Sequence, residues 1–176
     1  GILPGELKHE EEGPDGYRAH FVFPHPGEGI DLMTGPYVIA EHSISSVDGR
    51  TLKLRTYFHD EVADLAQTYL AAAGEQLAYH ESRLGPYPFE RFSVVSSPTP
   101  TGFGMPTLTY LGVQVLRLPF IRNTSLGHEI LHNWWGNGVY PDYASGNWSE
   151  GLTTYLADYT RLAQQDEDEA RQMRVN

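Results

Sequence analysis

The sequence predicts an α+β fold in which strands dominate the first third of the chain and helices dominate the rest. Short segments before residue 60 carry β-branched and aromatic residues at partial period two, with turn residues between them. From Asp60 to Leu84 the apolar residues instead recur every three or four positions, as in an amphipathic helix. This change of period divides the chain into a β-rich part, 1–59, and a mixed part, 60–176.

The composition excludes several classes of protein and site. The 176 residues include 23 acidic and 12 basic side chains, and the formal net charge is −11. Such a chain has no excess of cations with which to neutralise nucleic-acid phosphates or to dock on anionic lipid. The absence of Cys excludes disulfides, cysteine-ligated metal sites and a cysteine nucleophile. No basic and apolar leader is visible, and nothing in the composition indicates a compartment.

Three strands are predicted in the β-rich part, and they are Tyr17–Phe23, Tyr37–Ile44 and Thr51–Phe58. In the last of these, Leu52 and Leu54 alternate with polar residues, which is typical of a strand with one buried face. Asp48-Gly49 lies between the second and third strands and is a hairpin signal.

The mixed part opens with the predicted helix Asp60–Leu84, for which Asp60 is the expected N-cap and Gly85-Pro86 the stop signal. Phe92–Leu116 has no charged residue and is long enough to span a bilayer, but its Pro and Gly residues predict strands and turns. The expected elements are a strand at 92–96, a loop at 98–105, and either strands at 107–111 and 113–118 or one bent strand across both. Helices are expected at 123–135 and 148–174, the second either continuous or broken.

The residues that carry chemistry are concentrated in His128-Glu129-Ile130-Leu131-His132. Residues four apart on a helix share one face, so both imidazoles can reach one metal ion. Glu129 lies about 100° round the helix from His128, beside the open coordination position, where it can move a proton from a water to a leaving amine. We therefore predict one Zn²⁺ ion, with Glu129 as general base. The alternative is a core helix whose two His residues are satisfied by their neighbours.

A zinc site of this type needs a third protein ligand and leaves a fourth position for water. The candidates downstream are Asp142, Glu150 and Asp158. We predict Glu150, because it opens the next helix, and a carboxylate in the first turn of an antiparallel helix can reach the metal. Asp158 lies two turns further along, which we expect to be too far. Asp142 is a candidate hydrogen-bond partner for a ligating His.

Two runs around these residues carry a family resemblance, and they are His128-Glu-Ile-Leu-His-Asn-Trp-Trp-Gly-Asn137 and Trp148-Ser-Glu-Gly-Leu-Thr-Thr-Tyr155. They resemble the zinc-binding core of the M1 metallopeptidases, the gluzincin family of aminopeptidase N and leukotriene A4 hydrolase. The interval between His132 and Glu150 is one residue shorter than in the family, which we interpret as a shortened loop. The resemblance implies an aminopeptidase-like zinc peptidase in which His128, His132 and Glu150 bind zinc and Glu129 is the general base.

A third run, Gly102-Phe-Gly-Met-Pro-Thr-Leu-Thr-Tyr110, lies where the family has its Gly-Ala-Met-Glu-Asn substrate loop. The resemblance implies that Gly104, Met105 and Pro106 bind the substrate along a strand edge. Pro106 stands in place of the Glu that holds the substrate's free amino group in the family. Exopeptidase and endopeptidase specificity therefore both stay open.

The resemblance implies the end of an N-terminal β domain, 1–59, followed by the first part of a thermolysin-like catalytic domain, 60–176. The family's oxyanion-stabilising Tyr would lie beyond Asn176, since Tyr155 and Tyr159 are too close to Glu150. We expect a piece of a longer chain that binds zinc but has little peptidase activity alone. Its expected partners are a peptide or protein substrate and the rest of its own chain, with no nucleic acid and no membrane segment. The alternative is a metal-binding or interaction module that lacks peptidase activity.

Overall fold

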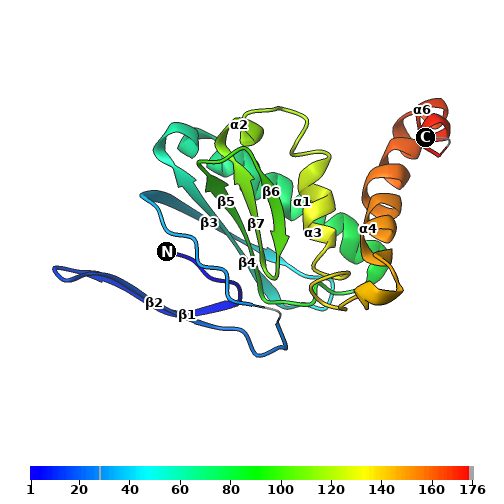
Figure 1. Ribbon diagram of the computed structural model, residues 1–176. Coiled ribbons are helices and arrows are strands. Elements are labelled where there is room, and N and C mark those ends of the chain that lie inside the picture. The colour runs from blue at the N-terminus through cyan, green and yellow to red at the C-terminus, as the bar shows by residue number, and fades with distance from the viewer. Residues whose placement is uncertain (28, 175–176) are drawn as a thin grey trace.

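The computed structural model describes residues 1–27 and 29–174, and it combines two sheets with a group of helices (Figure 1). The strands are β1 (Glu6–Gly13), β2 (Gly16–Val22), β3 (Tyr37–Ser45), β4 (Thr51–His59), β5 (Arg91–Ser97), β6 (Gly102–Met105) and β7 (Leu108–Gly112). The α-helices are α1 (Ala66–Leu84), α2 (Val113–Leu116), α3 (Ser125–Leu131), α4 (Trp148–Thr153), α5 (Thr160–Gln165) and α6 (Glu167–Met173). The expected α+β class is confirmed.

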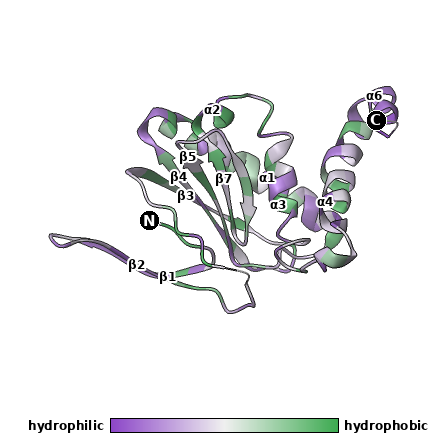
Figure 2. Cartoon of the chain, viewed as in Figure 1, coloured by the Kyte–Doolittle hydropathy of each residue, from purple (hydrophilic) through white to green (hydrophobic). Residues whose placement is uncertain are grey.

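The strands form two separate sheets. β1 and β2 make an antiparallel ribbon that projects from the rest of the molecule, and its outer end is hydrophilic (Figures 1 and 2). β1 was not predicted, because its run of charged residues conceals the period of a strand. The other five strands form one sheet in the order β3-β4-β5-β7-β6, so β6 lies at a free edge.

The five-stranded sheet includes strands from both sides of residue 59. β3 and β4 form the expected antiparallel hairpin around Asp48-Gly49, and β4 then pairs with β5 in parallel. Leu52 and Leu54 on β4 are fully buried beneath α1, as their alternation predicts. The division of the whole protein into a β domain, 1–59, and a catalytic domain, 60–176, stays a prediction, and residues 175 and 176 lie outside the described part.

The predicted helix at Asp60–Leu84 forms, with a different beginning. Asp60 is not the N-cap, because β4 continues to His59, whose extended backbone takes the cap position without a side-chain hydrogen bond. A 3₁₀ turn, Asp60–Leu65, then leads into α1. The helix ends at Gly85 as predicted, with a φ of 91° that a residue with a side chain rarely adopts.

Two predictions between residues 98 and 118 were wrong. The expected loop contains β6, a Gly-rich strand with little intrinsic preference that forms by pairing with β7. The expected strand at 113–118 is instead the short helix α2, because Val113 and Leu116 both turn inward at helical spacing. Among the described residues no helix has the length and apolar character that a bilayer crossing requires.

The last two predicted helices are shorter or more divided than expected. α3 ends at Leu131, and turns follow it. The expected helix at 148–174 consists of α4, the π-helix Thr154–Tyr159, α5 and α6, which form a column beside α3 (Figure 1). The column breaks at Asp166, whose carboxylate accepts hydrogen bonds from the backbone N–H groups of Asp168 and Glu169.

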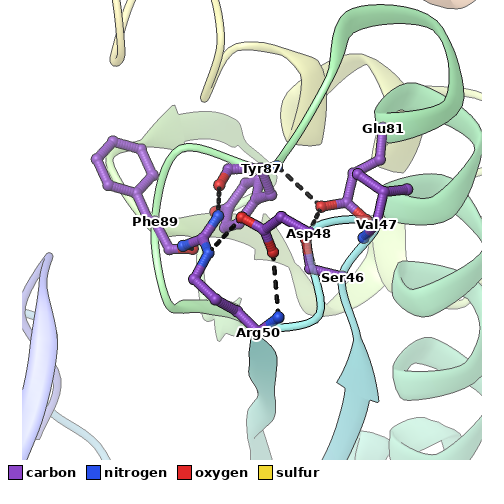
Figure 3. A network of polar contacts seen from close by, with 7 residues as sticks. All are labelled: Ser46, Val47, Asp48, Arg50, Glu81, Tyr87 and Phe89. Atoms are coloured by element: carbon purple, nitrogen blue, oxygen red, sulfur yellow. Dashed lines mark hydrogen bonds and ion pairs between the residues drawn. The ribbon is translucent and has the colours of Figure 1, made fainter.

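A buried carboxylate joins α1 to the β3–β4 turn. Figure 3 shows Glu81 pointing toward this turn, where it accepts hydrogen bonds from the Ser46 hydroxyl and, at 3.2 Å, from the Val47 N–H. It also accepts the Tyr87 N–H at 2.8 Å. Arg50 donates to the Tyr87 carbonyl at 2.7 Å from the same turn. Glu81 thereby ties the C-terminal end of α1 to the β3–β4 turn and to the segment before β5. The same helix packs against α3.

The contact between α1 and α3 includes a buried histidine. His80 is 2 % exposed, and its Nε2 donates a hydrogen bond to the Gly127 carbonyl at 2.9 Å, one residue before His128. Burial lowers the pKa of His80 to about 4, although the hydrogen bond to the Gly127 carbonyl acts in the opposite direction. The folded protein therefore favours neutral His80.

This histidine predicts a loss of stability in mild acid. The native pKa lies below the ordinary value of about 6.5. Keeping His80 neutral therefore contributes to the free energy of unfolding in full above pH 6.5. This contribution, on the order of 3 kcal/mol, is lost as the pH falls toward 4. Urea unfolding at pH 7 and pH 4.5 measures it. His80→Gln can keep the hydrogen bond but cannot titrate, so its stability should vary less with pH. Parallel profiles for the two proteins would contradict the prediction.

Candidate metal centre

Three side chains from two helices converge on one point. His128 lies in α3, His132 follows at its C-cap, and Glu150 lies in the first turn of α4. The Nε2 atoms of His128 and His132 are 3.1 Å apart. Glu150 places Oε1 at 3.1 Å from His128 Nε2 and Oε2 at 3.4 Å from His132 Nε2. One atom from each residue falls within a group no wider than 4.8 Å.

This donor set fits a zinc ion. Two ligands that each lie about 2 Å from a tetrahedral ion are separated by roughly 3.3 Å, close to the spacing of these nitrogen and oxygen atoms. Two imidazoles and one carboxylate also match the His₂Glu ligand set of catalytic zinc sites. We infer that His128, His132 and Glu150 could hold one such ion.

Local structure explains how the ligands reach this point. His132 keeps helical backbone angles at the C-cap of α3, so it stays on the same face as His128 although the helix is shorter than predicted. Asn147 caps α4 by accepting hydrogen bonds from the Glu150 N–H at 3.4 Å and the Ser149 hydroxyl at 3.0 Å. The capped turn directs Glu150 toward the two imidazoles.

The outer nitrogens of both imidazoles have hydrogen-bond acceptors. His128 Nδ1 lies 2.7 Å from Asp158 Oδ2, and His132 Nδ1 lies 3.2 Å from the Trp135 carbonyl oxygen. Such bonds hold the proton on Nδ1 and leave the Nε2 lone pair for a metal. The expectation that Asp142 would do this was wrong, because Asp142 instead accepts the Ala144 N–H in its own turn.

Asp158 reaches His128 from the end of the π-helix that follows α4. It is not a member of the ligand group, as expected, but the expected reason was wrong, because Asp158 lies close enough to contact the outer nitrogen of His128. The π-helix, Thr154–Tyr159, holds more residues in each turn than an α-helix, and this changes the direction in which its later residues, Asp158 among them, point. The face on which Asp158 lies could therefore not be inferred from α-helical spacing.

The electrostatics of the site favour a protonated outer nitrogen and a basic Glu129. Burial lowers the pKa of His128, but the hydrogen bond and charge of Asp158 outweigh it, so the pKa is raised overall. Burial raises the pKa of Glu129, although the neighbouring imidazoles oppose the shift. A bound cation would oppose it further. A general base works best when its pKa lies near the working pH.

One face of the edge strand β6 lies directly against Glu129. A Cβ atom placed on Gly104 of β6 would be 2.5 Å from Glu129 Oε2, so only glycine allows this approach. The Gly112 N–H bonds to the Thr101 carbonyl, which sets the phase of the β6–β7 ladder. By the alternation of antiparallel pairs, Gly102 and Gly104 direct their backbone groups to the free edge.

A strained turn joins this edge to α3. Thr107 has a φ of 68°, an unfavourable angle for a β-branched residue. Three hydrogen bonds hold it, because its N–H donates to Asn133 Oδ1, its hydroxyl accepts the Gly5 N–H and its carbonyl accepts the Ser93 N–H. Asn133 is fully buried and follows His132 directly. Asn133 was not predicted, and a polar side chain between His132 and two tryptophans was the signal available.

The cleft over the site has a volume of about 290 Å³ and is lined by β6, the end of α3 and the loop before α4. A second hollow of about 240 Å³ adjoins it, and Gly104 and Tyr143 line both. Of the predicted substrate-binding residues, Met105 and Pro106 line only the second hollow. The candidate metal ligands line the first hollow and not the second.

The fold matches solved structures over most of the chain. The M1 zinc metallopeptidase from Deinococcus radiodurans matches with a TM-score of 0.63 and 19 % identity, over 98 % of this chain and 39 % of that one. This chain has the fold of the M1 zinc metallopeptidases. The aminopeptidase A of Legionella pneumophila matches with a TM-score of 0.66 and 19 % identity, over 93 % of this chain and 21 % of its own. The resemblance to the M1 family is thereby confirmed at the level of the fold.

A curated relative is also an aminopeptidase. Aminopeptidase RNPEPL1 of Mus musculus is 29 % identical over 151 residues, which are 83 % of this chain and 20 % of that protein. The chain therefore spans about a fifth of the length of this relative. No family model matches the sequence.

Because Asp158 contacts His128, we expect its loss to weaken zinc binding. Asp158→Ala should weaken zinc binding about 10- to 100-fold, because losing an outer partner frees the imidazole to turn. Competition with a chromophoric chelator measures the affinity. Asp142→Ala is the matched control, since Asp142 has no contact with either His, and its affinity should stay within about twofold. Equal affinities for the Asp158 variant and the unmodified protein would refute the role of Asp158.

Proposed function

We propose that this chain carries the metal centre of a zinc-dependent, aminopeptidase-like metallopeptidase that hydrolyses peptide bonds. The observation that carries the proposal is the convergence of His128, His132 and Glu150 within 4.8 Å, at a cleft bordered by a free strand edge. A metal site alone has many uses, but an edge strand beside it can also bind an extended peptide.

His128 and His132 would each bind the ion through Nε2, and Glu150 through its carboxylate. When bound, zinc supplies Lewis acidity that polarises the scissile carbonyl and makes water nucleophilic at neutral pH. Asp158 holds the proton on His128 Nδ1 and fixes the ring, and the Trp135 carbonyl does the same for His132.

Glu129 moves the protons of the reaction. Its carboxylate accepts a proton from the attacking water and then delivers it to the nitrogen of the departing amine. The peptide backbone would lie along the edge of β6, where Gly104 brings it next to Glu129. Met105 and Pro106 would contact the part of the substrate that occupies the second hollow.

The neighbours support a peptide substrate. One structure of the Deinococcus radiodurans enzyme is described as bound to a Tyr-Ser-Ala substrate, and the Legionella pneumophila aminopeptidase A as a complex with aspartic acid. The activity of the whole protein is proposed by this analogy, because the chain spans 39 % of the first and 21 % of the second. The 176-residue chain alone is expected to bind zinc and show little turnover, with the rest of its own chain as its partner.

Zinc content and peptide hydrolysis together test the proposal. The chain and its Glu150→Ala variant are dialysed and analysed for metal, with Glu167→Ala on the exposed face of α6 as control. One zinc per chain in the unmodified and control proteins, and much less in Glu150→Ala, is expected. Equal zinc in all three would remove Glu150 as a ligand.

The full-length protein is then assayed with a panel of fluorogenic peptides. Hydrolysis that depends on zinc is expected. Bound zinc without hydrolysis of any peptide would favour the alternative, a metal-binding or interaction module without peptidase activity. Pro106 motivates this alternative, because it replaces the residue that binds the substrate's amino group in the family.

A further inference from the structure

The turn between β6 and β7 contains a residue in an unfavourable backbone conformation. Met105 pairs with Leu108, so Pro106 and Thr107 alone connect the two strands. Proline followed by a positive φ is typical of a type II turn, whose second central position favours Gly or Asn. Thr107 occupies this position with a φ of 68°, and among residues 1–27 and 29–174 no other residue except glycine has a positive φ. Type II turns also oppose the twist of a two-residue hairpin. Contacts with other elements must therefore hold this turn.

Hydrogen bonds fix all three polar groups of Thr107, which is 3 % exposed. Its hydroxyl accepts the Gly5 N–H at 2.8 Å, and its carbonyl accepts the Ser93 N–H at 2.9 Å. Its own N–H donates to Asn133 Oδ1 at 2.8 Å. Gly5 and Ser93 belong to the segment before β1 and to β5, whereas Asn133 belongs to the turn that follows α3. The third bond therefore joins the hairpin to the candidate metal centre.

The side chain of Asn133 is held from within its own segment. It is fully buried, and its Nδ2 donates to the Ile130 carbonyl at 3.0 Å, which directs Oδ1 toward Thr107. Ile130 lies between the two candidate His ligands, and Asn133 follows His132 directly. Moving the Thr107 amide alone would leave a buried N–H without an acceptor, and moving it together with Asn133 would displace the residue next to a ligand. The turn and the candidate ligands are thus joined mechanically.

The position of this turn determines the position of β6. β7 is the neighbour of β6 in the sheet, and α3 packs against both strands. Gly104 lies three residues before Thr107, and a Cβ atom on it would be 2.5 Å from Glu129 Oε2. A shift of the turn would pass along this short strand and change the distance between its backbone and Glu129. In the proposed reaction the substrate lies along β6, so the same shift would misplace the peptide.

We propose that Asn133 is a positioning residue that, through the Thr107 N–H, holds the edge strand β6 in place beside the candidate metal centre. The proposal rests on the proposed peptidase function, in which β6 binds the substrate backbone. Asn133 lines neither hollow, so it acts through Thr107 and not by contact with the substrate. The same contacts work in the other direction, because an ion that fixes His132 at the end of α3 also steadies Asn133 and the turn.

A substitution of Asn133 tests this role in the zinc-loaded full-length protein. Asn133→Ala removes the acceptor of the Thr107 N–H, so we expect the turn to leave its strained conformation and β6 to shift. The value of kcat/KM should fall about 100-fold, while the zinc content stays at one ion per chain. Asn123→Ala is the matched control, because Asn123 is exposed, precedes α3 and lines neither hollow. An Asn133→Ala variant with unchanged kcat/KM would overturn the proposal.

Rescue by a second substitution separates positioning from a general loss of packing. Thr107→Gly keeps the backbone N–H and relieves the strain, because glycine adopts a positive φ readily. Added to Asn133→Ala, it should restore kcat/KM by about tenfold, since the turn then forms without its bond to Asn133. Thr107→Gly alone, which also loses the hydrogen bond from Gly5, is the reference for the pair. A packing defect around residue 133 would not respond to a change at residue 107, so a double variant no more active than Asn133→Ala would overturn the proposal.

Hydrogen exchange provides a measurement that depends neither on turnover nor on the folding of a variant. The unmodified full-length protein is compared with and without zinc, and exchange is followed by mass spectrometry in the turn at residues 105–108. Zinc should slow exchange there about tenfold or more, while the β3–β4 turn around Asp48-Gly49, which is tied to α1, should exchange equally in both states. Equal exchange of the 105–108 turn with and without zinc would overturn the proposal. A zinc-dependent turn in a protein that hydrolyses no peptide would count against the peptidase function alone.

Discussion

Replacing Glu129 with Gln is expected to lower kcat of the zinc-loaded full-length protein by about 10³- to 10⁴-fold. Gln has nearly the same shape but cannot accept the proton of the attacking water or deliver it to the departing amine. The three metal ligands are unchanged, so one zinc ion per chain should remain. This combination of retained metal and lost turnover distinguishes a general base from a structural residue of the site.

Metal analysis and steady-state kinetics on the same preparation provide the measurement. Glu75→Gln is a suitable control, because Glu75 is an exposed acid on α1 and lies outside the cleft lining. It should retain the unmodified kcat. If Glu129→Gln kept both its zinc and its turnover, the assignment of Glu129 as general base would be wrong. Loss of zinc in the variant would instead show that Glu129 helps to bind the metal.

Gly104→Ala is expected to reduce turnover about 100-fold, with little effect on stability. The added Cβ would fall 2.5 Å from Glu129 Oε2, so one of the two must move. The obstructing atom is the end of a flexible side chain, and moving it costs the fold little. The displaced carboxylate, however, no longer meets the attacking water, and misplacement by about 1 Å costs roughly two orders of magnitude in rate.

Gly102→Ala is the comparison for this substitution. Gly102 lies two residues earlier on the same strand, and its Cβ would meet only Leu111 Cδ2 at 3.4 Å. Its loss of turnover should be less than about tenfold. Thermal unfolding checks that both variants keep the fold. Similar kinetics for the two variants would show that the close approach to Glu129 does not limit activity.

Local patterns in the sequence were sufficient for several elements. The apolar stripe from Val62 to Leu84 and the stop at Gly85 depend on neighbouring residues, and α1 ends where they predict. The Asp48-Gly49 hairpin follows from turn geometry in the same way. The four-residue spacing of His128 and His132 brings their Nε2 atoms to 3.1 Å through one turn of backbone.

Other features depend on partners far along the chain. β6 is Gly-rich and forms by pairing with β7, so no propensity indicates it. The role of Asn133 is evident only from the hydrogen bond that it accepts from the Thr107 N–H. The strained turn at Thr107 brings that group to Asn133. Asp158 takes the role that was expected of Asp142, as the outer partner of a ligating His, and it does so from a π-helix whose spacing differs from that of an α-helix. These are contacts between elements, and a single sequence carries no record of the distances involved.

By itself, the sequence determined the α+β class, the absence of cysteine chemistry and the chemical identity of the candidate site, because residue types and helical periodicity are local properties. The tertiary structure alone decided that Glu150 faces both imidazoles, that Gly104 brings the edge strand β6 against Glu129, and that Tyr143 borders both hollows. Each of these depends on how the helices and strands pack together, and packing is set by burial and hydrogen bonding across the whole chain.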